Sequence, residues 1–256
     1  MLTIQAINAF NDNYIWFIEE PESNTLLIVD PGDAKPVIHA IEQQDLHPVA
    51  LLITHHHYDH IAGINELVNK YNIPVYGPKT EAIPHITFPL ASCESLEIDS
   101  LFSPIRVLDV PGHTNGHIAF LIDGNLFCGD TLFSAGCGRL LGGTAKQLHA
   151  SLKLISSLPE QTMIFCTHEY TQENLRFASQ VEPHNKLIRQ RILDINALRL
   201  AGKPSLPSSL AVELKTNPFL RCHTAEVIMA TEQFCGRKLE TAEAVFTSLR
   251  SWKDQF

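Results

Sequence analysis

The segment Thr54–Gly63, with the sequence THHHYDHIAG, gathers side chains that can bind metal ions directly after the apolar run VALLI. Because His55 and His57 are two residues apart, both side chains point to the same side of an extended backbone. Asp59 continues that alternation, and His60 opens the next turn. Imidazole nitrogens and carboxylate oxygens are ligands of borderline and hard divalent metals. The spacing therefore predicts a metal site at the end of a buried strand.

Three later residues occur in the same context. His113 follows VLDVPG, Asp130 follows LFCG, and His168 follows MIFCT. Each comes just after an apolar strand, which is where an open α/β layer places its ligand-binding groups. A polar loop is the alternative explanation for the first cluster, and these recurrences argue against it.

Seven such side chains suit two metal ions, and no cysteine is required. A carboxylate has two oxygens, so one aspartate can serve both ions. One ion can take His55, His57 and His113, the other can take Asp59, His60 and His168, and Asp130 can bridge the two.

The composition indicates a protein of a reducing, aqueous compartment. The 256 residues allow one large domain or two modest ones. No apolar run approaches the roughly 18 residues of a membrane span, and the N-terminus lacks the basic start and apolar core of a signal peptide. The six cysteines form no CxxC pair, so we expect free thiols rather than disulfides. These features predict a cytoplasmic protein with no membrane partner.

Charge is unevenly distributed along the chain. Residues 1–169 contain 7 Lys and Arg against 19 Asp and Glu, a balance of −12, whereas residues 170–256 contain 12 against 9, a balance of +3. The acidic part argues against a nucleic-acid partner. The basic part suits a small anionic ligand or an ordinary solvated surface of helices. Because no heptad repeat or interface stripe is visible, we expect a monomer.

The pattern of apolar residues changes near Tyr170. Before it, short strands are mixed with helices, and after it only helical periodicity is visible. We therefore predict an α/β domain over residues 1–169 and an all-helical domain over residues 170–256. Strands are expected at Leu2–Phe10, Tyr14–Glu19, Thr25–Asp30, 49–53, 73–78, Ile105–Val110, His117–Ile122, Leu126–Cys128 and Thr162–Cys166, with helices at 31–44, Ile61–Lys70 and Thr144–Ser157 and a hairpin turn at Ile122–Asn125.

The histidine cluster resembles the hallmark of the metallo-β-lactamase-fold hydrolases, which reads HxHxDH. The later segments GHT, CGD and THEY match that superfamily in order and context. The resemblance implies a four-layer αβ/βα sandwich that holds two metal ions, here followed by the C-terminal all-helical domain. It does not imply a substrate, because lactamases, nucleases, lactonases, thioesterases and sulfur dioxygenases share this fold.

Over its whole length the chain is similar to glyoxalase II, the hydroxyacylglutathione hydrolase family. The matching segments are NDNYIW, THHHYDHIAG, PGHTNGH, GDTLFSAGCGR, THEYT, NPFLR and LRSWKDQF. The resemblance implies hydrolysis of S-(2-hydroxyacyl)glutathione, chiefly S-D-lactoylglutathione, to glutathione and D-lactate, the second step of methylglyoxal detoxification. It also implies that Arg139, Tyr170, Arg250 and Lys253 hold glutathione. Some members add a tyrosine where this chain has Leu141, so that contact is absent or is replaced by backbone.

The implied reaction uses a hydroxide that bridges two divalent metal ions and attacks the thioester carbonyl. Asp59 is the best candidate to orient the hydroxide proton, and Asp130 fixes the separation of the metals. A thiol has a pKa of about 8.5, so the glutathione thiolate leaves without a strong general acid. Zinc is the first expectation for the metal, and iron and manganese tolerate the same ligands.

The C-terminal cations and the histidine cluster each allow a second interpretation. Arg250 and Lys253 lie three apart on one helix face and can both reach one carboxylate, but cations near a helix C-terminus also favour the macrodipole. A persulfide dioxygenase of the same fold would use one iron held by two His and one Asp. A different thioesterase or a non-catalytic metal-binding scaffold are further possibilities. The complete set of seven ligands argues against the dioxygenase and the scaffold.

Three other residues attract attention. His56, the odd position between two ligands, is expected to point away and to serve packing or hydrogen bonding. Cys137, between two glycines, resembles a nucleophile, but a metal site makes one unnecessary. Arg221 in NPFLR is expected to be a structural ion-pair partner.

Overall fold

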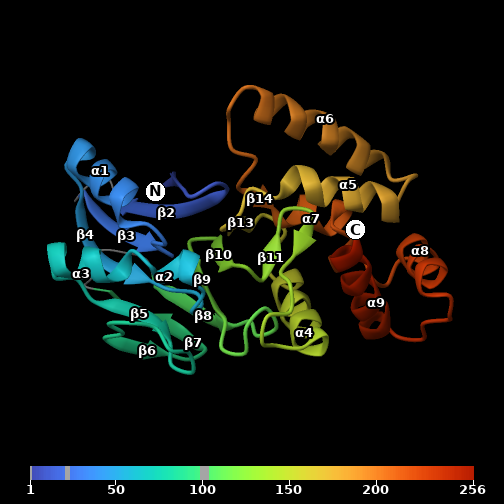
Figure 1. Ribbon diagram of the computed structural model, residues 1–256, viewed down its shortest axis with the longest axis horizontal. Coiled ribbons are helices and arrows are strands. Elements are labelled where there is room, and N and C mark those ends of the chain that lie inside the picture. The colour runs from blue at the N-terminus through green and yellow to red at the C-terminus, as the bar shows by residue number, and fades with distance from the viewer. Residues whose placement is uncertain (1, 21–23, 99–103) are drawn as a thin grey trace. The chain divides into compact units, whose positions relative to one another are not determined.

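The computed structural model describes residues 2–20, 24–98 and 104–256. The chain folds as two compact units, which we call unit 1 (Met1–Asp109 and Asn115–Gly129) and unit 2 (Val110–Thr114 and Asp130–Phe256). Figure 1 labels their helices and strands. The two units are separated by the density of contacts within each of them. The domain boundary predicted between residues 169 and 170 rests instead on the change in the pattern of apolar residues. The predicted domain boundary therefore stays a prediction.

A six-stranded sheet in unit 1 carries the first ligand cluster. Its strands run in the order β1-β2-β3-β4-β5-β6; β1, β2 and β3 are antiparallel, and β3 to β6 are parallel. Their bounds are β1 Thr3–Ala9, β2 Asn13–Glu20, β3 Thr25–Val29, β4 His47–Leu52, β5 Val75–Pro78 and β6 Phe88–Leu90. Strand β3 is buried along its whole length. The run VALLI thus lies mostly in a parallel strand, as its uniform apolarity predicts.

Helices of unit 1 lie beside this sheet in Figure 1 and contribute apolar side chains to its core. Helix α1 (Ala34–Gln44) begins after Asp33, whose carboxylate caps the backbone N–H of Lys35, and it buries Val37 and Ile41. Helix α3 (Ile64–Tyr71) adds Ile64 and Leu67 to the same apolar cluster. A connected core of this kind holds the ends of the strands in place, including the end of β4.

The single helix predicted at Ile61–Lys70 is wrong in detail. The chain instead forms a short helix α2 (Tyr58–Ile61) and then α3. Between them a Cβ on Gly63 would lie 2.5 Å from the carbonyl oxygen of Pro31, and the Gly63 N–H donates to that oxygen at 2.9 Å. This close approach separates the two helices. It also means that Asp59 lies on a helical turn, not on the extended alternation of His55 and His57.

A second group of strands in unit 1 is antiparallel throughout. It contains β7 Cys93–Leu96, β8 Ile105–Asp109, β9 Ile118–Ile122 and β10 Asn125–Gly129. The predicted hairpin at Ile122–Asn125 is confirmed, since these two residues pair directly. Asp123 and Gly124 both have positive φ, at 47° and 76°, as expected of a tight two-residue hairpin turn.

Unit 2 contains short strands and most of the longer helices. Its elements are β11 Leu132–Phe133, β12 Gly136–Cys137, α4 Ala145–Ser156, β13 Met163–Cys166, α5 Thr171–Val181, α6 Lys186–Leu200, β14 Ser208–Ser209, α7 Leu210–Thr216, the 3₁₀ turn Pro218–Leu220, α8 Ala225–Cys235 and α9 Ala242–Gln255. In Figure 1, α9 lies beside α4 and α8. Within the ranges that the structure describes, no helix is long and apolar enough to span a bilayer.

One strand occurs where only helices are predicted. Strand β14 pairs antiparallel with β13, with Ser208 opposite Ile164 and Ser209 opposite Met163. The prediction of no strand after residue 170 is therefore wrong at this point. Two serines carry no apolar alternation, so only their hydrogen bonding to β13 makes them a strand.

Candidate metal centre

His55 and His57 lie just beyond the end of β4. His55 is fully buried, and its Nε2 lies 3.0 Å from Nδ1 of His57. The other nitrogen of His55, Nδ1, lies 3.0 Å from the Thr54 hydroxyl. One nitrogen of His55 is thus held by a neighbouring side chain while the other faces His57, as predicted for two ligands that converge.

Asp30, which the sequence reasoning missed, organises the same cluster. Its Oδ1 accepts from the backbone N–H of Thr54 at 2.8 Å, and its Oδ2 accepts from the Thr54 hydroxyl at 2.7 Å. Oδ2 also lies 3.0 Å from Nδ1 of His60. A carboxylate on the second ring nitrogen is the usual partner of a metal-binding histidine, because it sets the tautomer and the ring orientation. Asp30 ends the apolar run of β3, and that position was the available signal.

Asp59 is held from another strand of unit 1. Asn13, which is buried at the start of β2, donates from Nδ2 to Oδ2 of Asp59 at 2.9 Å. The same carboxylate oxygen lies 3.6 Å from Nε2 of His60. Asp59 and His60 therefore stand together on α2, with the carboxylate oriented by a residue 46 positions earlier in the chain.

Unit 2 brings its three predicted ligands together around Asp130. Oδ2 of Asp130 lies 3.4 Å from Nε2 of His113 and 3.3 Å from Nε2 of His168. Nδ1 of His113 lies 2.8 Å from the backbone carbonyl of Arg139. All three ligand side chains are buried. The carbonyl partner turns Nε2 of His113 toward Asp130, in the same way that Asp30 holds Nδ1 of His60 in unit 1.

These donor sets fit divalent metal ions. In unit 1, one nitrogen from each of the predicted ligands His55 and His60 and one oxygen of their partner Asp30 lie within 4.8 Å of one another. Nitrogen and carboxylate oxygen donors suit zinc, iron or manganese. The histidines His55, His60 and His113 each have a hydrogen-bond partner at Nδ1, which is the arrangement of metal-binding imidazoles.

Tyr170 and Arg139 have different surroundings within unit 2. The Tyr170 ring stacks on His168, with centroids 4.7 Å apart and planes 2° apart. The Arg139 side chain is 74% exposed, and its Nε lies 3.9 Å from Oδ1 of Asp254. Tyr170 thus packs against a predicted metal ligand, and Arg139 presents an exposed cation to solvent. Leu141, where some relatives are expected to have tyrosine, is exposed.

Arg250 and Lys253 turn to different partners. Arg250 is buried; its Nη1 donates to the carbonyl of Cys137 at 2.9 Å and its Nη2 to Asp254 at 3.0 Å. Nζ of Lys253 lies over the rings of Phe177 and Phe256, at 5.4 and 5.3 Å. Burial, followed by the charge of Arg250, lowers the pKa of Lys253. Arg250 and Lys253 thus have different partners in this structure. Their spacing predicts that both can reach one carboxylate, and that interpretation stays a prediction.

One buried carboxylate, that of Glu213, anchors the segment that precedes Arg139. Glu213 accepts from the backbone N–H of Ala135 at 2.8 Å and from Asn217 at 3.0 Å, and it pairs with Arg191. Asn217 also donates to the carbonyl of Gly136 at 2.9 Å. Sequence reasoning missed this network because its members are far apart in the chain.

His56, Arg221 and the cysteines have the surroundings of structural residues. His56 turns to Glu81, with Nδ1 2.8 Å from Oε2, so its hydrogen-bonding role is confirmed. Arg221 pairs with Glu182 through Nε and Nη2, which confirms a structural ion pair. Burial raises the pKa of the Cys137 thiol to about 11, so this thiol is protonated at neutral pH and is a poor nucleophile. The cysteines of the described residues are free thiols, and the Cys93 side chain lies outside them.

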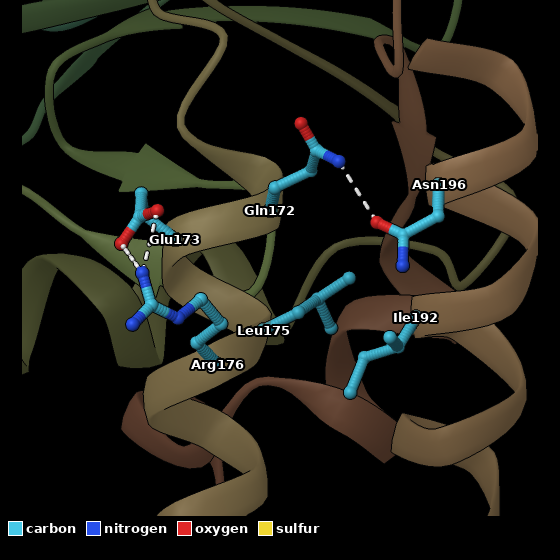
Figure 2. Close-up of a pocket in the computed structure, with 6 residues that line it drawn as sticks. All are labelled: Gln172, Glu173, Leu175, Arg176, Ile192 and Asn196. Carbon is cyan, nitrogen blue, oxygen red and sulfur yellow. Dashed lines mark hydrogen bonds and ion pairs between the residues drawn. The ribbon is translucent and has the colours of Figure 1, made fainter. Parts of the chain in front are cut away.

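A pocket of about 240 Å³ opens between α5 and α6 (Figure 2). Gln172 donates to Asn196 across it at 2.8 Å, and Arg176 pairs with Glu173 beside it at 2.9 Å. Its lining consists of Gln172, Glu173, Leu175, Arg176, Ile192 and Asn196. The polar groups bond to one another, and none of the predicted ligand or substrate residues lines the pocket.

Comparison with known proteins gives matches over the whole chain. Residues 10–168 match the sequence model of the Metallo-beta-lactamase superfamily, and residues 169–256 match that of the Hydroxyacylglutathione hydrolase C-terminus. The chain is 50% identical over 255 residues to a Hydroxyacylglutathione hydrolase of Alkalilimnicola ehrlichii, covering 100% of both chains. It is 46% identical over 256 residues to one of Nitrosomonas europaea, covering 100% of this chain and 97% of that one.

A solved structure gives the same fold. The crystal structure of TTHA1623 in a di-iron-bound form has a TM-score of 0.60 and 26% sequence identity to this chain. The similarity covers 84% of this chain and 100% of that chain. Because unit 1 contains fewer residues than this share of the chain, the likeness extends beyond unit 1.

Proposed function

Since the chain belongs to the hydroxyacylglutathione hydrolase family of the metallo-beta-lactamase superfamily, we propose that it hydrolyses S-(2-hydroxyacyl)glutathione thioesters. The favoured substrate is S-D-lactoylglutathione, and the products are glutathione and D-lactate. The family relationship confirms the predicted family, the predicted mixed α/β fold with a C-terminal helical region, and the predicted class of enzyme, a hydrolase.

One observation carries the proposal. Three histidines of the chain have the hydrogen-bond partners that orient metal-binding imidazoles, namely Asp30, Thr54 and the Arg139 carbonyl. The same chain matches the Hydroxyacylglutathione hydrolase C-terminus over residues 169–256. The first feature supplies the chemistry of hydrolysis, and the second supplies the substrate class. Neither feature alone separates this activity from others on the same fold.

The ligands of the proposed centre are the seven predicted side chains. We assign His55, His57 and His113 to one divalent ion, Asp59, His60 and His168 to a second, and Asp130 to both. Zinc is the proposed metal, with iron or manganese as alternatives that the same ligands accept. When bound, such ions supply Lewis-acid chemistry that makes water nucleophilic near neutral pH and polarises a carbonyl group.

The chain's own residues orient the reacting groups. Asp59, held by Asn13 at 2.9 Å, is proposed to accept a hydrogen bond from the attacking water and to direct its lone pair toward the thioester carbonyl. Asp130 accepts no proton in this scheme. Its proposed role is to fix the distance between the metal-binding side chains of unit 2. The departing thiolate needs no acid from the chain, because a thiol pKa of about 8.5 already makes it a good leaving group.

The proposed glutathione-binding residues are three cations and one tyrosine of unit 2. We propose that Arg139, Tyr170, Arg250 and Lys253 bind the glutathione moiety, which carries two carboxylates. Arg139 is the exposed cation of the four. Because position 141 is a leucine, we propose that a backbone group replaces the contact with glutathione that a tyrosine would make there. The proposed setting is the cytoplasm, in the second step of methylglyoxal degradation, with the protein acting as a monomer.

The test follows the thioester absorbance of S-D-lactoylglutathione in the presence of the purified chain. We expect loss of absorbance with release of one thiol and one D-lactate per thioester. A chelator should stop the reaction, and added zinc should restore it, with elemental analysis giving two metals per chain. Oxygen uptake with glutathione persulfide and one iron per chain would favour the dioxygenase alternative. A sample with two metals that leaves every thioester intact would contradict the proposal and favour a scaffold.

A further inference from the structure

Glu81 is a buried carboxylate in unit 1 that has no role in the scheme above. It lies just after β5, and its side chain is only 4% exposed. Oε2 accepts from the backbone N–H of His56 at 2.7 Å and lies 2.8 Å from Nδ1 of the same residue. Oε1 accepts from the backbone N–H of Gly116 at 2.9 Å. One carboxylate thus binds the backbone at positions 56 and 116, which are 60 residues apart in the sequence.

Both anchor points of Glu81 adjoin the histidine cluster. His56 stands between His55 and His57, so its N–H belongs to the backbone that sets both rings. Gly116 precedes His117, whose ring stacks on His55 with centroids 4.6 Å apart and planes 19° apart. The same two segments meet again where Ile118 N–H donates to the Thr54 carbonyl at 3.0 Å.

The contact at Gly116 is too close for a side chain. A Cβ there would lie 2.3 Å from Oγ1 of Thr80 and 2.5 Å from Cγ of Glu81. Glycine therefore allows the carboxylate to reach the backbone N–H. Charge-assisted hydrogen bonds from N–H groups to a buried carboxylate are roughly twice as strong as neutral ones, which suits an anchor.

We propose that Glu81 is a positioning residue of the metal centre, which holds the backbone around His55 and His57 in ligand geometry before a metal binds. Ordering the residues of a loop costs conformational entropy, so a loop that the protein already fixes leaves more of the coordination energy for metal affinity. Partners of this kind typically change metal affinity or activity by about 10- to 100-fold. The inference rests on the proposed function only through the assignment of His55 and His57 as metal ligands.

The test measures zinc affinity by competition with a chromophoric chelator. We expect Glu81→Ala to weaken zinc binding by about 10- to 100-fold relative to the unsubstituted chain. Glu81→Gln should weaken it nearly as much, because an amide has one acceptor oxygen and would turn its NH₂ toward the second backbone N–H. The metal-free variants should keep the near-ultraviolet circular dichroism of the folded chain.

Two control variants separate positioning from a general loss of stability. His56→Ala removes the side-chain contact and keeps the backbone N–H, so we expect less than about a threefold change in zinc affinity. Glu66→Gln removes an exposed carboxylate from α3 of the same unit and should leave zinc affinity unchanged. Zinc affinity in Glu81→Ala equal to that of the unsubstituted chain, or an equal loss in Glu66→Gln, would overturn the proposal.

A second measurement does not depend on the variants folding. In the unsubstituted, metal-free chain, the amides of His56 and Gly116 should be protected from hydrogen exchange, although neither residue lies in a helix or strand. Exchange of both amides at the rate of an unfolded peptide would also overturn the proposal. Because zinc affinity and thioester hydrolysis are separate readouts, a chain that binds zinc and leaves S-D-lactoylglutathione intact contradicts the proposed function alone.

Discussion

The two units present their predicted metal ligands by different means. In unit 1 the four ligands lie within His55–His60, and the neighbouring residues Asp30, Asn13 and Glu81 hold this one segment. In unit 2 the ligands come from three separate segments and meet at a single carboxylate. A local cluster depends on the conformation of one loop, whereas a dispersed set depends on the folding of several segments at once. The residue shared by the dispersed set should therefore be the most sensitive position.

The largest expected effect is that of Asp130→Ala. This change removes the carboxylate that lies within 3.4 Å of both His113 and His168. We expect loss of bound metal and of nearly all turnover, because the two histidines lose their common partner and the proposed centre loses its bridge. Elemental analysis and the rate of thioester loss measure this. A variant with two metals per chain and more than a tenth of the activity would show that Asp130 is not shared.

The corresponding change in unit 1 is Asp30→Asn, and its effect should be smaller. An amide in this position can donate to Nδ1 of His60, which would place the ring proton on Nε2 and remove its lone pair from the metal. We expect metal affinity to fall by about 10- to 100-fold, measured by chelator competition. The control is Asp45→Asn, an exposed helix cap with φ of 52°, which asparagine tolerates. Equal affinities in both variants would contradict the role of Asp30.

The two units also differ in how much space surrounds a glycine with positive φ. Gly112, beside His113, has φ of 144°, and a Cβ there would lie 2.4 Å from Cα of Leu148. Gly124 in unit 1 has φ of 76° and open space around it. We expect Gly112→Ala to destabilise the metal-free chain by at least about 2–4 kcal/mol through combined strain and overlap, against about 1–2 kcal/mol for Gly124→Ala. Urea unfolding measures both, and equal losses would mean that the loop of His113 adapts easily.

The cations of unit 2 allow a sharper comparison within one unit. Arg139→Ala should raise KM for lactoylglutathione by about tenfold, or 1.4 kcal/mol, and leave Tm unchanged, because an exposed ion pair contributes little. Arg250→Ala should raise KM and also lower Tm, since buried hydrogen bonds to the Cys137 carbonyl are lost. Steady-state kinetics and calorimetry separate the two effects. Unchanged KM in Arg250→Ala would reject this residue as a glutathione contact.

The smallest expected effect concerns pH. Burial lowers the pKa of Lys253, so this side chain loses its charge at a lower pH than a free lysine does. KM for the anionic thioester should therefore stay constant below the lowered pKa and rise as pH increases through it. Lys253→Arg keeps the charge and should abolish the rise. A KM profile that is identical in the two proteins would show that Lys253 does not bind the substrate as a cation.

The secondary structure could be predicted where a continuous apolar run or a turn motif marks it in the local sequence. Thr25–Asp30 and the run VALLI were correctly predicted as strands because fully buried parallel strands are continuously apolar. The hairpin at Ile122–Asn125 was correct because IDGN demands positive φ. Strands β6, β7, β11, β12 and β14 were missed, since runs of two to four residues carry no clear period. The helix at Ile61–Lys70 failed at Gly63, where contact with Pro31 outweighed helical spacing.

The residue types and their spacing predicted metal ligands at strand ends, because imidazole and carboxylate chemistry is a property of single side chains. The resemblance of whole segments to known sequences predicted the family of thioester hydrolases, to which the chain belongs. Tertiary structure alone decided which partners orient the ligands. Asp30, Asn13 and Glu81 lie 24 or more positions from the groups they hold, and a hydrogen bond depends on distance in space rather than in sequence. For the same reason only the fold could show that Arg250 donates to the Cys137 carbonyl, 113 positions away.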